Sequence, residues 1–556
     1  MGSQPMEYRS LALLRSWPTR DLVELGAELG FNALEFIGGG VSSHLDFRRL
    51  ADEEGFFDWA DEFDMSTALW IREFDDYNRS WWGEPTLDNE HLWTGIRRRY
   101  EAICELYPEV DYFALKTVES HEWITDPAVL ERLIAVINDV CREYEKTLIY
   151  RSFLWHPEQL EGVRTIIDAI PEDVVIMTKC VGNDWNYRAS HHPLIGDVGA
   201  HDQYVEIDVA SEYHRLDDVA NAFTEEIRRR FDYWVEQGVT GIHVRPLWAA
   251  KRERTDRAED PVEALPWSSH SVVGKAQEAN LWTLGRLATG ESDADADDLE
   301  EIWHEFATRR FGAEAADTII EVLGPTGEVV EEALCVDRET FGDPRRRIPA
   351  IMTMEGRTAE KRTDEEAESL PPQFEAYLEG RETPTDTTHS FQLDTNPFAR
   401  NWSTWRWDPS YRPTYHRLRR GHPNIVERKE RAVREARESA RESLERLETV
   451  ADDLPEDGYE FVRFKLRENE FLLEVMSEME LAWLRASNRL YYDEGDDERI
   501  ATRADVEAHL ERLDALTDRY GESVECTWRG ISYELHRGEY VDIAGYLEEF
   551  RRYWEL

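Results

Sequence analysis

The sequence has few basic residues, and very few of these are lysine. It contains 65 Lys and Arg against 117 Asp and Glu over 556 residues, a formal net charge of −52, and only about eight of the basic residues are Lys. A nucleic-acid binder needs a basic face that releases phosphate counterions, so this charge excludes that class. An acidic surface with little lysine predicts a halophilic protein, because concentrated salt screens the self-repulsion. An acidic mesophilic enzyme is the alternative.

Cysteines, signal-peptide features and long hydrophobic runs are also scarce or absent. The five cysteines are scattered without a CxxC pair, which argues against a disulfide framework or a zinc site and fits a reducing compartment. The first residues, MGSQPMEYRS, lack the basic and apolar regions of a signal peptide, and no apolar run approaches the length of a membrane span. We therefore predict a cytoplasmic protein with no membrane partner and no metal or other cofactor.

Aromatic residues, in contrast, are abundant. They make up 11% of the chain and include 20 Trp, and 41% of all residues are hydrophobic. A disordered chain of high net charge has few aromatics, so this composition indicates a folded protein with a large core.

Short apolar runs alternate with amphipathic helical stretches through the first half of the chain. The eight predicted strands are Ser10–Ser16, Ala33–Ile37, Ser66–Ile71, Tyr112–Thr117, Thr147–Phe153, Val174–Lys179, Tyr204–Ala210 and Gly241–Trp248. Eight strands alternating with helices predict an α/β fold, the (β/α)₈ TIM barrel. A doubly wound sheet is the alternative, but no GxGxxG follows any of the strands.

The pattern predicts three regions along the chain. Residues 1–312 form the catalytic barrel and its post-barrel helices, residues 313–423 a loop-rich connection, and residues 424–556 an all-α C-terminal domain. The expected C-terminal helices are Asn424–Leu454, Leu466–Tyr492, Arg503–Tyr520 and Ile543–Tyr553. The first of them carries Arg and Glu at spacings of three and four, which suits either a solvated charged face, the default, or the surface of a homodimer.

Ionisable residues gather at the ends of the predicted strands. Lys116, Arg151 and Lys179 lie in or beside apolar strands, and such cations are seldom buried without a partner. They either pair with carboxylates of the barrel itself or form a cationic pocket for an acidic sugar. Glycoside hydrolysis needs two carboxyl groups, and Glu119, Asp184 and Glu212 follow three different strands and could converge at one mouth.

The segment from Val174 to Arg215 resembles the corresponding region of glycoside hydrolase family 67, the α-glucuronidases. Lys179 with Asp184 five residues later, the HPLIG turn, Glu206, Asp208 and the Glu212-Tyr213 pair follow the family's order. LIYRSF around Arg151 and the helix pair from Asn280 are similar to two other stretches of the family, so the resemblance covers roughly residues 8–312. The chain is expected to begin at the first barrel strand, without the family's N-terminal domain.

The resemblance implies a reaction and a set of roles. The family cleaves α-linked glucuronic acid, or its 4-O-methyl ether, from xylan-derived oligosaccharides with inversion. It implies that Glu119 is the general acid, although Glu122 is the alternative because Glu119 lies one residue closer to Lys116 than in the family. The base is Asp184 or Glu212. The implied substrate-binding residues are Lys116, Arg151, Lys179, Trp185, Asp208 and Tyr213.

Three other functions fit the same fold. The first is a glycosidase acting on another glycan. The second is a metal-dependent sugar isomerase or epimerase, with Mg²⁺ or Mn²⁺ ligands drawn from His191, His192, His201, Glu206 and Asp208. The third is a barrel that binds glycans without catalysis.

Overall fold

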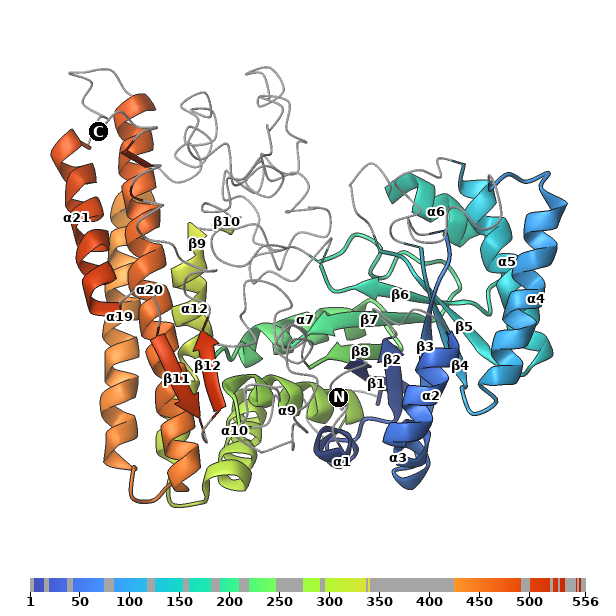
Figure 1. Ribbon diagram of the computed structural model, residues 1–556, viewed down its shortest axis with the longest axis horizontal. Coiled ribbons are helices and arrows are strands. Elements are labelled where there is room, and N and C mark those ends of the chain that lie inside the picture. Colours follow the sequence, from blue (N-terminus) through green and yellow to red (C-terminus); the bar gives the residue numbers. More distant parts are fainter. Residues whose placement is uncertain are drawn as a thin grey trace.

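The computed structural model describes most of the barrel and of the C-terminal helices (Figure 1). The described residues are 5–14, 20–37, 44–74, 85–117, 126–153, 160–181, 191–209, 220–246, 274–290, 296–336, 339–340, 425–491, 501–520, 524–528, 531–535, 547 and 550–551.

Eight parallel strands form a closed barrel, in which each strand pairs with the next along the chain and β8 pairs with β1. The strands are β1 (Tyr8–Leu14), β2 (Ala33–Ile37), β3 (Ser66–Arg72), β4 (Tyr112–Lys116), β5 (Thr147–Arg151), β6 (Val175–Lys179), β7 (Gln203–Asp208) and β8 (Gly241–Arg245). They overlap all eight predicted strands, so the (β/α)₈ TIM barrel is confirmed.

Helices surround the barrel. They are α1 (Arg20–Glu28), α2 (His44–Glu54), α3 (Phe56–Glu62), α4 (Glu90–Leu106), α5 (Pro127–Glu143), α6 (Leu160–Ala169), α7 (Thr224–Glu236) and α9 (Ala276–Thr289). The start of α5 shows how the sequence defines one of them. The Asp126 side chain accepts a hydrogen bond from the Ala128 amide at 3.1 Å, and Pro127 occupies the first helical position, where no N–H is needed.

The barrel interior is apolar at its N-terminal end. The ring of Tyr8 stacks on Tyr204 with centroids 4.4 Å apart. Gly241 at the start of β8 makes room for this pair, because a Cβ there would lie 2.5 Å from the Tyr204 ring. Alternate residues of each strand point into the barrel. The positions of these aromatic residues therefore determine which residues of the same strands point inward at the C-terminal end of the barrel.

The chain after the barrel is mainly helical. Its elements are α10 (Ala296–Phe311), α11 (Ala316–Leu323), α12 (Thr326–Leu334), β9 (Cys335–Val336), β10 (Glu339–Thr340), α19 (Ile425–Thr449), α20 (Glu456–Tyr491), α21 (Arg503–Tyr520), β11 (Val524–Trp528) and β12 (Ile531–Leu535). A C-terminal helical region is thereby confirmed, and it also contains the antiparallel pair β11–β12, which an all-α assignment did not include.

The boundaries differ from the sequence expectation in two further places. Part of the segment 313–423, predicted to be loop-rich, forms α11 and α12, because its apolar residues recur at helical spacing and Ile319 and Val322 are buried. The helix expected from Leu466 begins ten residues earlier, at Glu456, where Phe461 and Val462 extend the buried face. Residues 341–424 lie outside the described part of the chain.

The C-terminal helices α19, α20 and α21 stand beside the barrel, with α12 packed against α19 and α20 (Figure 1). Asn469 on α20 donates its side-chain amide to the Ala220 carbonyl at 2.7 Å, just before α7. Gly327 on α12 lets this helix approach the backbone of Ala222 closely, because a Cβ at Gly327 would lie 1.9 Å from the Ala222 carbonyl oxygen. These contacts join the helical region directly to the barrel. Among the described helices, none is long and apolar enough to cross a membrane.

Candidate active site at the mouth of the barrel

Six consecutive strands end in a charged residue. These last residues of β3 to β8 are Arg72, Lys116, Arg151, Lys179, Asp208 and Arg245. The strand register places Arg72 opposite Lys116, Lys116 opposite Arg151, and Asp208 opposite Arg245. All six occupy strand positions whose side chains point into the barrel, as do those of the interior aromatic residues. Five cations and one carboxylate therefore lie together at the C-terminal mouth. In a chain with a net charge of −52, this mouth is a local cationic site.

Glu206 lies one layer below the mouth and binds two of these cations. Arg151 donates to it through Nε at 2.5 Å and Nη2 at 2.8 Å, and Arg245 Nε lies 3.2 Å from the same carboxylate. Burial alone would raise the pKa of Glu206, but the charges of Arg151 and Arg245 outweigh it and hold the pKa well below its usual range. Glu206 is therefore a fixed anion that orients two guanidinium groups.

Aromatic faces support the same cations. The Arg151 guanidinium carbon lies 5.0 Å from the Trp70 ring centroid and 4.9 Å from that of Phe153. Arg245 lies 5.5 Å from Trp70, and the Lys179 ammonium lies 4.9 Å from Phe153. A cation over a ring face is stabilised by the ring quadrupole, and more so where water is excluded. The site thus places oriented cationic groups against aromatic rings, and this arrangement suits an anionic ligand.

The structure brings together four of the residues predicted from sequence. Lys116, Arg151, Lys179 and Asp208 all reach the mouth from adjacent strands. The expectation that the cations pair with barrel carboxylates also holds for Arg151, through Glu206. The remaining predicted residues lie outside the described part of the chain; they are Glu119, Glu122, Asp184, Trp185, Glu212 and Tyr213. Their roles stay predictions.

Sequence reasoning missed Arg72 and Arg245 as members of this site. The available signal was their position, since each is the last residue of an apolar strand, as are Lys116, Arg151 and Lys179. It also missed the cluster around Glu35 on β2. The Glu35 side chain, which is fully buried, interacts with residues of β1, β3 and β8.

The ligands considered for a metal-dependent isomerase have other contacts. His191 stacks on Tyr233 with centroids 3.9 Å apart, and burial lowers its pKa to about 2. His192 accepts a hydrogen bond from the Leu194 amide at 3.1 Å, and Glu206 binds the arginines. Within the part of the chain that the structure describes, no group of three or more His, Cys, Asp or Glu is placed to hold a metal ion.

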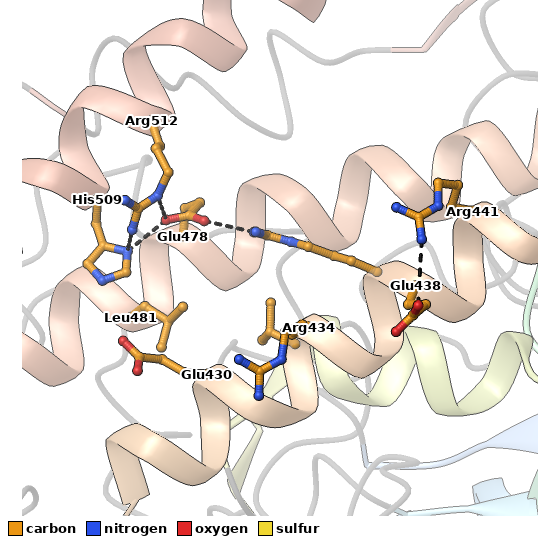
Figure 2. A pocket seen from close by; sticks show the side chains of 10 residues that line it. Glu430, Arg434, Glu438, Arg441, Glu478, Leu481, His509 and Arg512 are labelled. Carbon is orange, nitrogen blue, oxygen red and sulfur yellow. Dashed lines mark hydrogen bonds and ion pairs between the residues drawn. The ribbon is translucent and has the colours of Figure 1, made fainter.

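A concave site lies among α19, α20 and α21, with a cavity of about 530 Å³. Figure 2 shows Glu478 facing His509 and Arg512 at its edge. Glu478 is bound by His509 at 2.7 Å and by Arg437 and Arg512 at 2.9 Å each. Burial opposes its ionisation, but the hydrogen bond from His509 and the charge of Arg437 lower its pKa to about 2. These charges compensate one another across three helices, so the cluster stabilises the helical bundle. The barrel mouth therefore remains the candidate active site.

No family model matches the sequence, and no curated protein matches it. The resemblance to family 67 therefore stays a prediction. Among solved structures, the chain is similar to a family GH115 4-O-methyl-α-glucuronidase with specificity for decorated arabinogalactans (13% identity, TM-score 0.48), covering 97% of this chain and 60% of that one. The chain thus spans less than two thirds of that protein's length.

Two other solved structures illustrate the range of similar proteins. The chitobiase of Flavobacterium johnsoniae has 11% identity and a TM-score of 0.35, with 92% of this chain and 75% of that chain covered. The D-allulose 3-epimerase of Methylomonas sp. has 10% identity and a TM-score of 0.32, with 51% and 100% covered. At this level of similarity, none of these structures carries information about the reaction or substrate of this chain.

Proposed function

We propose that the chain is a glycoside hydrolase that removes a terminal α-linked uronic acid, glucuronic acid or its 4-O-methyl ether, from oligosaccharides with inversion. The observation that carries the proposal is the group of cationic residues at the C-terminal ends of the barrel strands. Five of six consecutive strands end in Arg or Lys at one mouth, in a chain with a net charge of −52.

The arrangement at the mouth favours a carboxylate over a neutral group. Arg151 and Arg245 are oriented by Glu206 and supported by Trp70, so a bound anion need not order them first. Guanidinium groups match the geometry of a carboxylate, and Lys179 adds a point charge beside them. A neutral hexose would leave these cations without the ligand charge, which is the basis for discrimination.

The bond cleavage is assigned to residues that follow the same strands. Glu119 or Glu122 comes after β4 and would protonate the leaving oxygen, while Asp184 after β6 or Glu212 after β7 would activate water. Inversion requires the two carboxyl groups to lie about 6.5–9.5 Å apart. Glu206 takes neither role, because its lowered pKa keeps it ionised and it is bound by two arginines.

The test is a screen of 4-nitrophenyl uronosides and aldouronic acids in high salt, with anomer-resolved NMR of the first product. We expect hydrolysis of an α-uronoside with a β-configured first product, and loss of hydrolysis in Glu119→Gln or Glu122→Gln and in Asp184→Asn or Glu212→Gln, with folding intact. A product that retains the α-configuration would contradict the mechanism. Full activity in all four variants would contradict the site assignment.

A further inference from the structure

A carboxylate without contact to solvent lies beneath the barrel mouth. Glu35 is 0% exposed, and its Oε1 accepts hydrogen bonds from Tyr8 at 2.8 Å and Ser10 at 2.6 Å. His243 Nδ1 lies 2.8 Å from the same oxygen. The other oxygen, Oε2, accepts a hydrogen bond from the Trp70 indole N–H at 2.7 Å.

These contacts explain how a charge persists at this depth. Burial raises the pKa of Glu35, but the neighbouring charge of His243 and the hydrogen bonds from His243, Ser10 and Trp70 outweigh it, so the pKa lies below its ordinary value. An ionised carboxylate is a stronger acceptor than a neutral one, and its hydrogen bonds fix their donors more firmly. Glu35 therefore holds the edge of the Trp70 ring in one place.

The face of that ring supports the cations of the site. Arg151 and Arg245 lie 5.0 and 5.5 Å from the Trp70 centroid. Both bind Glu206, so a rotation of the indole would displace both guanidinium groups and the carboxylate between them. The contacts form one continuous chain from Glu35 through Trp70 to the mouth.

We propose that Glu35 is a positioning residue that acts through Trp70 to set the two arginines that receive the substrate's carboxylate. This role rests on the proposed function for its substrate but on the described contacts for its geometry. Tyr8, Ser10, His243 and Trp70 together surround the Glu35 carboxylate with hydrogen-bonding groups, as a buried carboxylate requires. A site whose supporting residues are fixed in this way holds its ligand-binding groups closer to the productive geometry.

The substitution Glu35→Gln tests this role selectively. If the amide of the new glutamine keeps its oxygen toward Tyr8, Ser10 and His243, its NH₂ group points toward the indole N–H of Trp70. Two hydrogen-bond donors then face each other. The second variant is Trp70→Phe, which removes the indole N–H and keeps an aromatic face. The matched control is Glu278→Gln on α9, where another buried carboxylate accepts an indole N–H, from Trp282 at 3.1 Å, outside the barrel interior.

We expect the KM for a uronoside and the Kd for free glucuronate to rise about tenfold or more in Glu35→Gln, with a smaller change in kcat. Residues that orient metal ligands act in a similarly indirect way, and their loss typically costs about 10- to 100-fold. Trp70→Phe should give a similar rise. The double variant should be no worse than the more affected single variant, since both act on one contact. Glu278→Gln should leave both constants unchanged.

A second measurement separates this inference from the proposed function. The Nε–Hε signal of Arg151 in ¹⁵N NMR spectra, assigned with Arg151→Lys, should shift in Glu35→Gln and not in Glu278→Gln. Equal behaviour of those two variants in the NMR signal would overturn the positioning role, whatever the substrate. A wild-type protein that neither hydrolyses uronosides nor binds glucuronate would refute the proposed function, and the Arg151 signal would still decide the positioning role. Strictly additive effects of Glu35→Gln and Trp70→Phe on KM would also overturn it.

Discussion

Replacing Arg151 with methionine should strongly destabilise the barrel. The Arg151 and Glu206 side chains are 5% and 1% exposed, and breaking such a buried pair costs about 3–5 kcal/mol because it leaves an uncompensated charge. The retained contact from Arg245 to Glu206 reduces this cost, whereas the lost cation–π contacts with Trp70 and Phe153 add about 0.5–2 kcal/mol. We expect a net loss of about 4 kcal/mol.

Thermal unfolding followed by differential scanning calorimetry at pH 7 measures this loss. The unfolding entropy is about 2.1 cal/mol/K per residue, so for a barrel of roughly 300 residues a loss of about 4 kcal/mol lowers Tm by about 6 °C. The control is Arg20→Met, which breaks an ion pair with Glu62 in which both side chains are 48% exposed. Pairs of that kind are worth about 0–1 kcal/mol, so the control should lower Tm by no more than about 2 °C.

The variant Arg151→Lys tests the cause of the effect. It keeps a positive charge beside Glu206 and loses the paired guanidinium geometry, so it should lose less stability than Arg151→Met. Equal Tm values for Arg151→Met and Arg20→Met would refute the reasoning. An Arg151→Lys variant as unstable as Arg151→Met would show that the loss does not come from the charge.

Three further outcomes follow from other parts of the structure. The pKa of Glu478 is about 2 against an ordinary 4.5, so the ionised side chain contributes about 3 kcal/mol to the free energy of unfolding. This contribution should be present above pH 4.5 and be lost as the pH falls toward 2, and Glu478→Gln should flatten this part of the pH dependence of Tm. Burial raises the pKa of Cys104 to about 11 and of Cys180 to about 12, so mass spectrometry should find neither labelled by iodoacetamide at pH 7.5 before unfolding. Gly327→Ala should lower the free energy of unfolding by about 1–3 kcal/mol, because the new Cβ meets the Ala222 carbonyl, and an unchanged Tm would contradict that contact.

The barrel could be predicted from sequence because each strand is a short apolar run between helical patterns. GIHVR and TLIYR, for example, form β8 and β5, and Pro127 after Asp126 marks the start of α5. The hairpin β11–β12 could not be predicted in the same way. Its segments, VECTW and ISYEL, mix charged and apolar residues and adjoin a helical pattern, so local periodicity did not separate them from the helices.

The site could be predicted only in part. A cation at the end of an apolar strand is conspicuous in sequence, and this signal identified Lys116, Arg151 and Lys179. The contact from Glu35 on β2 to Trp70 on β3 depends on how inward side chains meet across a closed barrel, as does the approach of Arg245 to Glu206. No spacing along the chain encodes those distances, because they follow from strand register and tilt.

The most direct test of the central claim compares kcat/KM for 4-nitrophenyl α-D-glucuronide with that for 4-nitrophenyl α-D-glucoside, using the wild-type protein in high salt. The two substrates differ only in the carboxylate that the cationic mouth is proposed to bind. We predict that the glucuronide is preferred by about 10³-fold or more, because only the glucuronide presents a carboxylate to the cations at the mouth. Equal values, or a preference for the glucoside, would contradict the account.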